Sequence, residues 1–395
     1  MECEGPGEVV YYSDLTWRSQ YPYLILVNSI IPALLAGNSV ILKPSPQTPT
    51  VAEQTQKIFT EAGLPQDVMQ NFHCGSFERL ATIVKAPEIS LICFTGSVNG
   101  GLAVQQAASD KVAVRVGLEL GGKDPAYIRR DVDIKWAAEE IVDGAIFNSG
   151  QSCCSLERIY VDEAIHDEFV TAVQEVLKRY RLGDPFDTKT HVGPVVSRRA
   201  AETITAHVKD ALDQGAKDST PANESFESPP EGGNYVSPKL LTNVTHKMKV
   251  MTEETFGPII PVMKVSSDEE AIKLMNDSHF GLTASIWTKD VETGHRLADV
   301  STTHSSWQGK ATIDAHQQDV EAGTVFVNRC DYPSPVSWKF HTAHAAPSVL
   351  SPNKCHSQDL AWTGWKESGK GQTLSQFGFD QFVKLKSYHV KDYPK

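Results

Sequence analysis

Between residues 23 and 121, short apolar runs alternate with helix-like segments, and this alternation constrains the fold more than any other feature of the chain. Apolar runs of this kind are typical of parallel strands that are buried on both faces, and each is separated from the next by a segment that predicts a helix. Strands and helices in this order predict an α/β fold with a doubly wound parallel sheet. The runs are SVILKP, VMQNFHC, ISLICFTG and VAVRVGLELGG.

The stretch 23–42 could be mistaken for a membrane span, because it carries no charge and is about 20 residues long. However, Asn28, Pro32 and Gly37 interrupt it, and a Pro followed by Gly-Asn is typical of a helix that stops and turns. We therefore expect a buried helix and then a buried strand. A membrane-anchored protein that spans at 23–42 is the disfavoured alternative.

A second unit begins near residue 121, with a helix that leads to two adjacent cysteines and a polar, Pro- and Gly-rich loop over 219–234. We expect a cofactor-binding domain over 20–120 and a catalytic domain over 121–371. Residues 372–395 should form a C-terminal helix and strand. The final segment, FVKLKSYHVKDYPK, alternates as an exposed strand does, and such a strand needs a partner. This predicts an oligomer.

The charge balance is acidic, with 49 Asp and Glu against 37 Lys and Arg, and no basic stripe is visible. Nucleic acid is therefore an unfavourable partner. The cysteine spacings match no zinc pattern, so we expect no metal, and adjacent cysteines rarely bridge each other. A reduced, cytoplasmic location fits these thiols best. The first residues lack the basic and apolar regions of a secretory signal.

The segment FNSGQSCCSLERIYV places Cys153 and Cys154 on a polar turn after a helix that ends near Gly150. A cysteine nucleophile needs access and a base. Glu119, at the end of an apolar strand in GLELGGKDP, is the best candidate, because a half-buried carboxylate can have a raised pKa. Alone, each residue would more simply be a core cysteine or a solvated glutamate. Together they predict covalent catalysis.

The order of several motifs adds to this interpretation. LELGGKDP, Gly-Gln-x-Cys and EETFGP, together with FTGSVNGG, AGTVFVN, TGWKESGKG and the segment from YPYL to SPQTP, resemble the NAD(P)-dependent aldehyde dehydrogenase superfamily. The resemblance covers nearly the whole chain from about Tyr21. It implies an aldehyde-dehydrogenase-like α/β fold, with a doubly wound cofactor domain, an α/β catalytic domain and an oligomerisation strand. In its full-length form such a protein would be a homodimer or homotetramer.

The resemblance also implies a mechanism. Cys153 would attack the aldehyde, and Cys154 would be a bystander that points elsewhere. Hydride transfer to NAD or NADP would convert the thiohemiacetal to a thioester, and water activated by Glu119 would release the carboxylic acid. A thioester-forming or acyl-reducing relative is the nearest alternative among enzymes, and Glu119 argues against it.

Further positions carry over from the same motifs. Lys43 and Ser45 would meet the adenosine ribose, and Pro46, where NAD-preferring members have an acid, would tolerate NADP. The FTGSVNGG loop would hold the pyrophosphate at a helix N-terminus, and Glu254 and Phe256 would hold the nicotinamide ribose and ring. The residues expected at the pyrophosphate are Gly96, Ser97 and Gly101.

The expected aldehyde tunnel comprises Tyr21, Leu24 and Asn28. It contains no arginine that could hold a carboxylate, so a semialdehyde acid is not favoured as the substrate.

The chain departs from the family pattern in three ways. Gln20 stands where the family has an oxyanion-hole asparagine, and its side chain carries the same amide on a longer arm. Family members have further residues before this point that are not in the sequence, and a membrane anchor in such a segment stays an open alternative. Residues 300–318 and 336–358 interrupt motifs, and both begin Val-Ser and end Gln. Unspliced in-frame introns that begin with GTGAGT and end with CAG would encode these residues. Transcript sequencing tests this hypothesis against real surface loops. A catalytically inactive paralogue or mis-spliced fragment with a binding or structural role therefore remains an alternative function.

Overall fold

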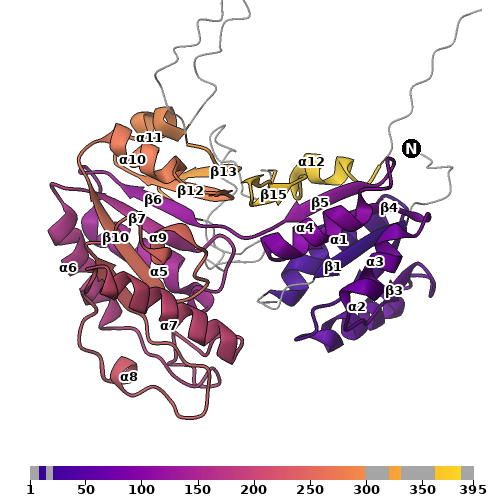
Figure 1. Ribbon diagram of the computed structural model, residues 1–395, viewed down its shortest axis with the longest axis horizontal. Coiled ribbons are helices and arrows are strands. Elements are labelled where there is room, and N and C mark those ends of the chain that lie inside the picture. The colour runs from indigo at the N-terminus through magenta and orange to yellow at the C-terminus, as the bar shows by residue number, and fades with distance from the viewer. Residues whose placement is uncertain (1–8, 15–20, 299–319, 331–360, 384–395) are drawn as a thin grey trace, which may run out of the picture.

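The computed structural model describes residues 9–14, 21–298, 320–330 and 361–383 of the 395-residue chain. These residues form two lobes side by side, as Figure 1 shows. Residues 9–14 and 21–119 build one lobe, residues 124–298 and 320–327 build the other, and residues 361–383 lie across both. The two interrupting segments, 300–318 and 336–358, and the expected terminal strand after residue 383 lie outside the described residues.

The first lobe is a parallel sheet with helices on both faces, as the alternation predicts. Leu91 and Cys93 pack toward one pair of helices, while Ile92 and Phe94 pack toward the other pair. Its elements are β1 (Val9–Asp14), α1 (Pro22–Leu35), β2 (Ser39–Lys43), α2 (Pro49–Glu61), β3 (Met69–Asn71), α3 (Phe77–Lys85), β4 (Ile89–Thr95), α4 (Val98–Ala108) and β5 (Arg115–Glu119). Helices α1 and α2 cover one face, and α3 and α4 cover the other, so the doubly wound fold is confirmed.

The strand β1 was not predicted, and it begins before the domain boundary expected at residue 20. It lies in the middle of the first sheet, parallel to β2 on one side and to β4 on the other. A central strand of a parallel sheet normally reads as a continuous apolar run. The strand sequence VVYYSD has only two such residues followed by tyrosines and polar residues, so pattern alone gave no signal.

The uncharged stretch 23–42 forms the helix α1 and the strand β2, as expected. Gly37 has a positive φ of 81° at the turn between them, and the side-chain amide of Asn38 donates to Ala33 O and Phe382 O at 3.1 and 3.0 Å. The turn is thereby tied to the C-terminal segment. None of the described helices has both the length and the apolar character that a bilayer crossing requires.

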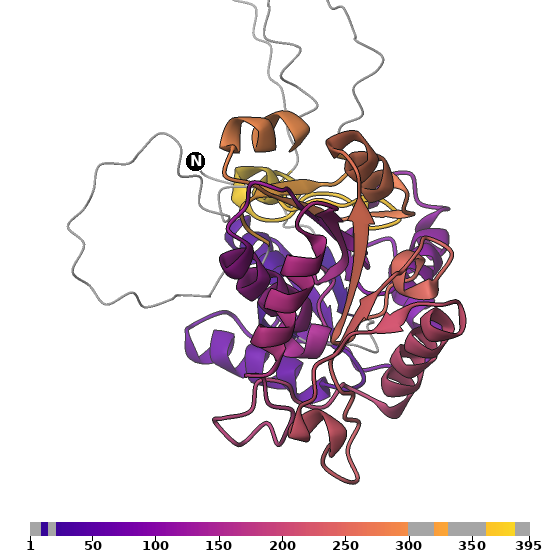
Figure 2. The same cartoon turned by 90° about the vertical axis from the view of Figure 1, so that its left-hand side faces the viewer.

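The second lobe is also a largely parallel sheet between helices. Figure 2 shows its helices as layers on either side of the strands. Its elements are β6 (Asp124–Ile128), α5 (Ile134–Ile146), the 3-10 turn η1 (Phe147–Gly150), β7 (Leu156–Asp162), α6 (His166–Leu177), α7 (Arg198–Asp213), β8 (Lys217–Asp218), α8 (Glu224–Glu227), β9 (Lys239–Thr242), α9 (Lys249–Thr252), β10 (Ile259–Val265), α10 (Asp268–Asn276), β11 (Phe280–Gly281), β12 (Thr283–Trp287), α11 (Val291–Ala298) and β13 (Thr324–Val327). The described strands are ordered β13-β12-β6-β7-β10-β9-β8, and only β8 runs antiparallel to its neighbour.

Two apolar cores flank this second sheet. One contains α5 and α6, and the other contains α7, α9 and α10. The loop expected over 219–234 contains the short helix α8, because the Asn223 side chain accepts a hydrogen bond from Ser225 N at 3.0 Å and starts a helical turn. The remainder of that loop is irregular, as its composition predicts.

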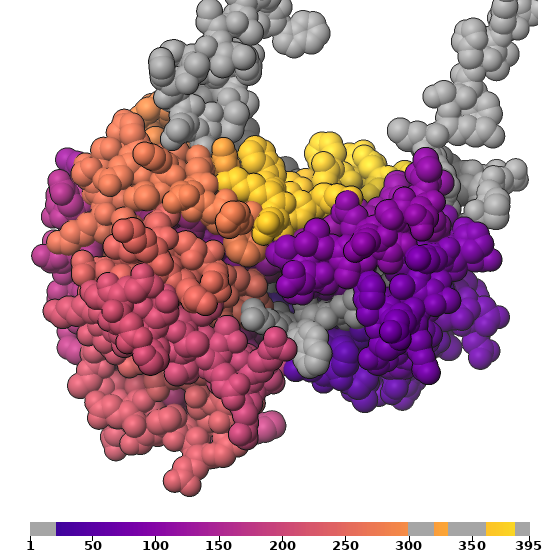
Figure 3. Space-filling model, viewed as in Figure 1, coloured from indigo at the N-terminus to yellow at the C-terminus, as the bar shows by residue number. Residues whose placement is uncertain are grey.

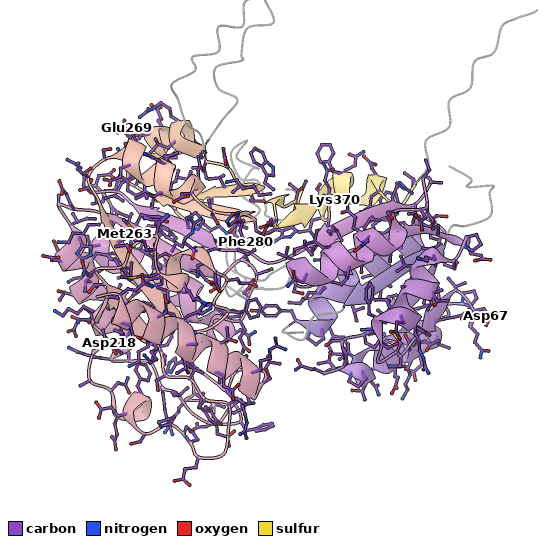
Figure 4. The ribbon with its side chains drawn as sticks, in the orientation of Figure 1. Asp67, Asp218, Met263, Glu269, Phe280 and Lys370 are labelled. Carbon is purple, nitrogen blue, oxygen red and sulfur yellow. The ribbon has the colours of Figure 1, made fainter. Side chains whose placement is uncertain are left out.

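The C-terminal segment joins the two lobes. It contains β14 (Trp365–Lys366), β15 (Gly369–Lys370) and α12 (Ser375–Asp380). Strand β14 pairs with β11 in the second lobe, and β15 pairs with β5 in the first, both antiparallel. Figure 4 labels Phe280 on the second lobe and Lys370 on the bridging segment. The bridge therefore fixes the end of β5, where Glu119 lies, relative to the second lobe.

Candidate functional site

A cavity of about 810 Å³ lies between the two lobes, at the ends of β4 and β5 (Figure 3). It brings together residues that are far apart in the sequence. Those that were singled out from the sequence and line the cavity are Tyr21, Leu24, Asn28, Gly96, Ser97, Glu119, Cys153, Glu254 and Phe256. Lys43, Ser45, Pro46 and Gly101 do not line it, and Gln20 lies outside the described residues.

The turn before Cys153 owes its shape to close contacts with neighbouring backbone. Gly150 has a φ of 70°, and a Cβ there would lie 2.2 Å from Gly257 O. Similarly, a Cβ on Gly122 would lie 2.1 Å from Cys153 O, so only glycine lets the strand that carries Glu119 approach the cysteine. Gly122 therefore lets the segment after Glu119 contact Cys153, and Gly150 lets the turn before Cys153 contact Gly257.

The side chain of Gln151, the glutamine of the Gly-Gln-x-Cys motif, holds the turn before Cys153 in place. Its side chain donates to Asn148 O at 3.1 Å and accepts from Val196 N at 2.8 Å, so it closes the turn and ties it to the next segment. A buried amide with both ends bonded rigidifies a loop. Cys153 is consequently presented into the cavity from a fixed backbone.

The two cysteines differ in exposure. Cys153 is half-buried, whereas Cys154 is 3% exposed and its Sγ lies 3.1 Å from Ser152 Oγ. Cys154 nevertheless borders the cavity. That Cys154 is a bystander stays a prediction. Neither takes part in a disulfide, and no group of metal-ligating side chains occurs in the part of the chain that the structure describes.

Glu119 ends β5 and is held on both sides. Its carbonyl accepts from Gly96 N at 2.9 Å, and the strand beyond it is bonded by Leu120 N to Ser368 O at 3.0 Å. Burial of the carboxyl raises its pKa, because a charged carboxylate is poorly solvated in the cavity wall. A carboxylate with a raised pKa is a stronger base, and it lines the same cavity as Cys153.

The N-terminus of helix α4, in the first lobe, borders the cavity. Ser97 caps α4, its Oγ accepting from Gly100 N at 3.2 Å, and Gly96, Ser97 and Asn99 line the cavity. Such a terminus favours a phosphate, because its amides and dipole carry positive partial charge. Gly101 has a packing role instead, since a Cβ there would lie 2.7 Å from Leu120 Cδ2.

Residues Lys43, Ser45 and Pro46 lie at the end of β2, beside the cavity wall that contains Gln47. Lys43 and Ser45 are each 1% exposed, and Pro46 is exposed. The structure therefore places the first two inside the protein and the proline at its surface. Their expected contact with an adenosine ribose stays a prediction.

The turn that carries Glu254 and Phe256 is the opposite wall. Glu254 Oε1 accepts from Gly122 N at 3.3 Å, which brings this carboxylate against the strand segment that follows Glu119. Phe256 is 6% exposed and has an unusual φ of 57° for a non-glycine residue. A left-handed phenylalanine is strained and needs neighbouring bonds to hold it.

Sequence reasoning missed the buried ion pair that supplies those bonds. Lys123 Nζ lies 2.6 Å from Glu157 Oε2 and 3.1 Å from Thr255 Oγ1. The Glu157 carboxylate also accepts from Thr255 N and Phe256 N, both at 2.7 Å. The sequence signal for this pair is the charged Glu157 near the start of the strand LERIYV, because a charge that is buried in a strand requires a partner.

Helix α7 also lines the cavity, which the sequence did not indicate. Its lining residues include Arg199, Thr203 and His207. His207 is 4% exposed, and its Nδ1 lies 3.2 Å from Thr255 Oγ1. Burial, with a smaller contribution from Lys123, lowers the pKa of His207. The ring therefore favours its neutral form beside the turn that carries Glu254.

The three residues expected to form an aldehyde tunnel all border the cavity. Tyr21, Leu24 and Asn28 border the cavity from the start of α1, where Ile25 joins them. Trp362 and Leu374 reach the same cavity from the C-terminal segment. This wall is mainly apolar, and the only arginine among the described lining residues, Arg199, belongs to α7. The role of this wall in binding an aldehyde stays a prediction.

Comparison with known proteins agrees with the motifs and the fold. A profile of the Aldehyde dehydrogenase family matches residues 19–332. The chain is 32% identical over 372 residues to retinaldehyde dehydrogenase 3 of Homo sapiens, covering 94% of this chain and 64% of that protein. It thus spans about two thirds of the length of this relative.

Solved structures show the same fold. Succinic semialdehyde dehydrogenase from Streptococcus pyogenes, in complex with NADP+, superposes with a TM-score of 0.81 at 25% identity, covering 98% of this chain and 74% of that one. Betaine aldehyde dehydrogenase from Staphylococcus aureus, in complex with NAD+, gives 0.76 at 27% identity, covering 95% and 65%. The chain belongs to the aldehyde dehydrogenase family.

Proposed function

We propose that this chain oxidises an aldehyde to the carboxylic acid with NAD or NADP, through a covalent adduct on Cys153. The observation that carries the proposal is that Cys153, Glu119 and Glu254 line one cavity between the two lobes. The thiolate of Cys153 would form a bond to the carbonyl carbon and give a thiohemiacetal. After oxidation, Glu119 would take a proton from the water that hydrolyses the thioester.

A nicotinamide dinucleotide suits the residues of this cavity. The N-terminus of α4 offers a phosphate site, and the Glu254 carboxylate and the Phe256 ring stand on the opposite wall. When bound, such a cofactor accepts the hydride that leaves the thiohemiacetal carbon. Relatives of known structure hold NADP+ in one case and NAD+ in another. Glu119 favours water as the acyl acceptor, and therefore oxidation over a thioester-forming reaction.

The mainly apolar wall around Tyr21 and Leu24 favours an uncharged aldehyde over a semialdehyde that carries a carboxylate. The test is the absorbance of reduced cofactor with purified protein, a panel of aliphatic and aromatic aldehydes, and NAD or NADP. A copy without 300–318 and 336–358 is assayed beside it. Oxidation by either copy supports the proposal, and its absence in both favours an inactive protein with a binding role. A homodimer or homotetramer is proposed on family grounds.

Replacing Glu119 by glutamine is expected to lower the rate of thioester hydrolysis by about 10²–10⁴, the usual contribution of a general base. In the wild type this rate should fall with acid through a pKa above that of an ordinary glutamate, because burial raises the pKa of Glu119. The pH profile of kcat checks this. A profile with the pKa of an ordinary carboxyl group would contradict it.

The same substitution should stabilise the fold at neutral pH. Because the pKa of Glu119 is raised in the folded state, the folded protein binds this proton more tightly than the unfolded chain does. Proton binding to Glu119 therefore stabilises the fold fully at pH values below the pKa that Glu119 has in the unfolded chain. It is lost as pH rises through the folded pKa. Glutamine remains neutral and avoids that loss. Denaturant unfolding at neutral and acid pH should therefore show Glu119→Gln above wild type at neutral pH, with the difference shrinking in acid.

We expect NAD and NADP to support oxidation within about tenfold of each other, because Pro46 offers no carboxylate to repel a 2′-phosphate. Lys43→Met should weaken both cofactors, and Lys57→Met, an exposed change on α2, is the control. Quenching of protein fluorescence measures both affinities. A preference for NAD of about a thousandfold would contradict this prediction.

A further inference from the structure

The hydroxyl of Tyr21 is buried in the wall of the cavity and has no hydrogen-bond partner among the described residues. Tyr21 directly precedes α1, and its side chain makes no capping bond to that helix. A buried hydroxyl without a partner is unfavourable, because it gives up its hydrogen bonds to water and gains none in return. Such atoms are rare in folded proteins, and one that lines a cavity is available to bind a group that enters it.

The groups near the Tyr21 hydroxyl determine its protonation state. Burial raises the pKa of Tyr21, and nearby Cys154 and Cys153 raise it further, because a phenolate would be repelled by a thiolate. Asn148 and Ser152 approach the hydroxyl and partly offset this rise, yet neither reaches hydrogen-bonding geometry. The hydroxyl therefore stays protonated at working pH, as a hydrogen-bond donor in the cavity that Cys153 also lines.

We infer that the Tyr21 hydroxyl donates a hydrogen bond to the oxygen of the tetrahedral adduct that forms on Cys153. This inference rests on the proposed function. The thiolate electron pair forms the C–S bond, and the carbonyl π pair moves onto the oxygen, where negative charge develops. The phenol O–H of Tyr21 donates to that oxygen without transferring its proton. When the adduct collapses, the C=O bond re-forms, and hydride passes with its electron pair to NAD(P)+.

Such a donor acts on the reaction rate more than on substrate binding. A hydrogen bond that strengthens as charge develops stabilises the transition state, and losing one commonly costs about 10²–10³ in kcat. The aromatic ring of Tyr21 contributes to the wall independently of its hydroxyl. Phenylalanine keeps that ring, so Tyr21→Phe removes the proposed donor alone.

The experiment compares Tyr21→Phe with Tyr23→Phe, the same change on an α1 residue that is 48% exposed and does not line the cavity. Two reactions are followed in each variant: aldehyde oxidation with NAD or NADP, and cofactor-free hydrolysis of 4-nitrophenyl acetate. The ester also acylates a thiolate through a tetrahedral adduct, and nitrophenolate leaves when that adduct collapses. We expect Tyr21→Phe to lower kcat about 10²–10³ in both reactions, with KM nearly unchanged.

The outcomes separate the inference from the proposed function. If Tyr21→Phe stays within about twofold of Tyr23→Phe in kcat, the inference is wrong. A raised KM at unchanged kcat would also overturn it, because the hydroxyl would then bind the ground state. Ester hydrolysis without aldehyde oxidation would refute the proposed function, and the ester reaction would still test Tyr21. A wild type that performs neither reaction overturns both.

Discussion

Replacing Cys153 by serine is expected to lower aldehyde oxidation by about a millionfold, to the background rate, as loss of a covalent nucleophile does. A serine hydroxyl is a much weaker nucleophile than a cysteine thiolate, because a hydroxyl loses its proton far less readily than a thiol. The fold should be unaffected, because the half-buried side chain changes by one atom. Reduced-cofactor absorbance and circular dichroism measure the two effects.

Cys154→Ser is the matched control, since it makes the same change one residue along the chain. Cys154 is 3% exposed beside Ser152, so the serine should cost some stability but little rate. If Cys154→Ser abolished oxidation while Cys153→Ser retained it, the assignment of the nucleophile would be reversed. Both cysteines border the cavity, which makes this control informative.

The second large effect concerns stability. Lys123→Met would leave the Glu157 carboxylate buried without its cation, and removing one partner of a buried pair costs about 3–5 kcal/mol. The backbone amide of Phe256 donates a hydrogen bond to the Glu157 carboxylate, so Phe256 would then be held less firmly in its left-handed conformation. Denaturant unfolding measures the loss, and cofactor affinity should fall with it because the same turn carries Glu254.

Two further variants control this prediction. Lys57→Met breaks an exposed pair on α2, 3.8 Å from Glu61, and should cost less than about 0.5 kcal/mol. The double change Lys123→Met with Glu157→Gln removes both charges and should recover part of the loss. A loss below about 1 kcal/mol in Lys123→Met alone would show that this ion pair does not hold the turn.

Much of the fold was readable because it depends on local apolar pattern. The parallel strands β2 and β4 are mainly apolar runs, and the helices α2, α3 and α4 begin with Pro or a Ser cap. In contrast, β1 occupies the centre of the sheet with a half-polar sequence, so its placement depends on tertiary pairing with β2 and β4. Pattern reasoning has no access to such long-range pairing.

The candidate site divides in the same way. Cys153, Glu119 and Glu254 lie in motifs that resemble a known family, and the fold brings them to one cavity. The contacts that hold those residues in position could not be predicted from the sequence. Glu157 and His207 reach Thr255 from elements distant in sequence, and only the packed structure shows that they meet. The resemblance located the reacting groups, whereas their positioning depends on three-dimensional contacts.

The most direct test of the account is to trap the covalent adduct. Purified protein is mixed with an aldehyde and NAD or NADP, quenched in acid at short and long times, and digested, and the peptide that contains Cys153 and Cys154 is fragmented in a mass spectrometer. We predict an acyl mass on Cys153 at short times that disappears with turnover and persists in Glu119→Gln. An unmodified Cys153 throughout aldehyde oxidation, or an acyl group on Cys154, would contradict the account.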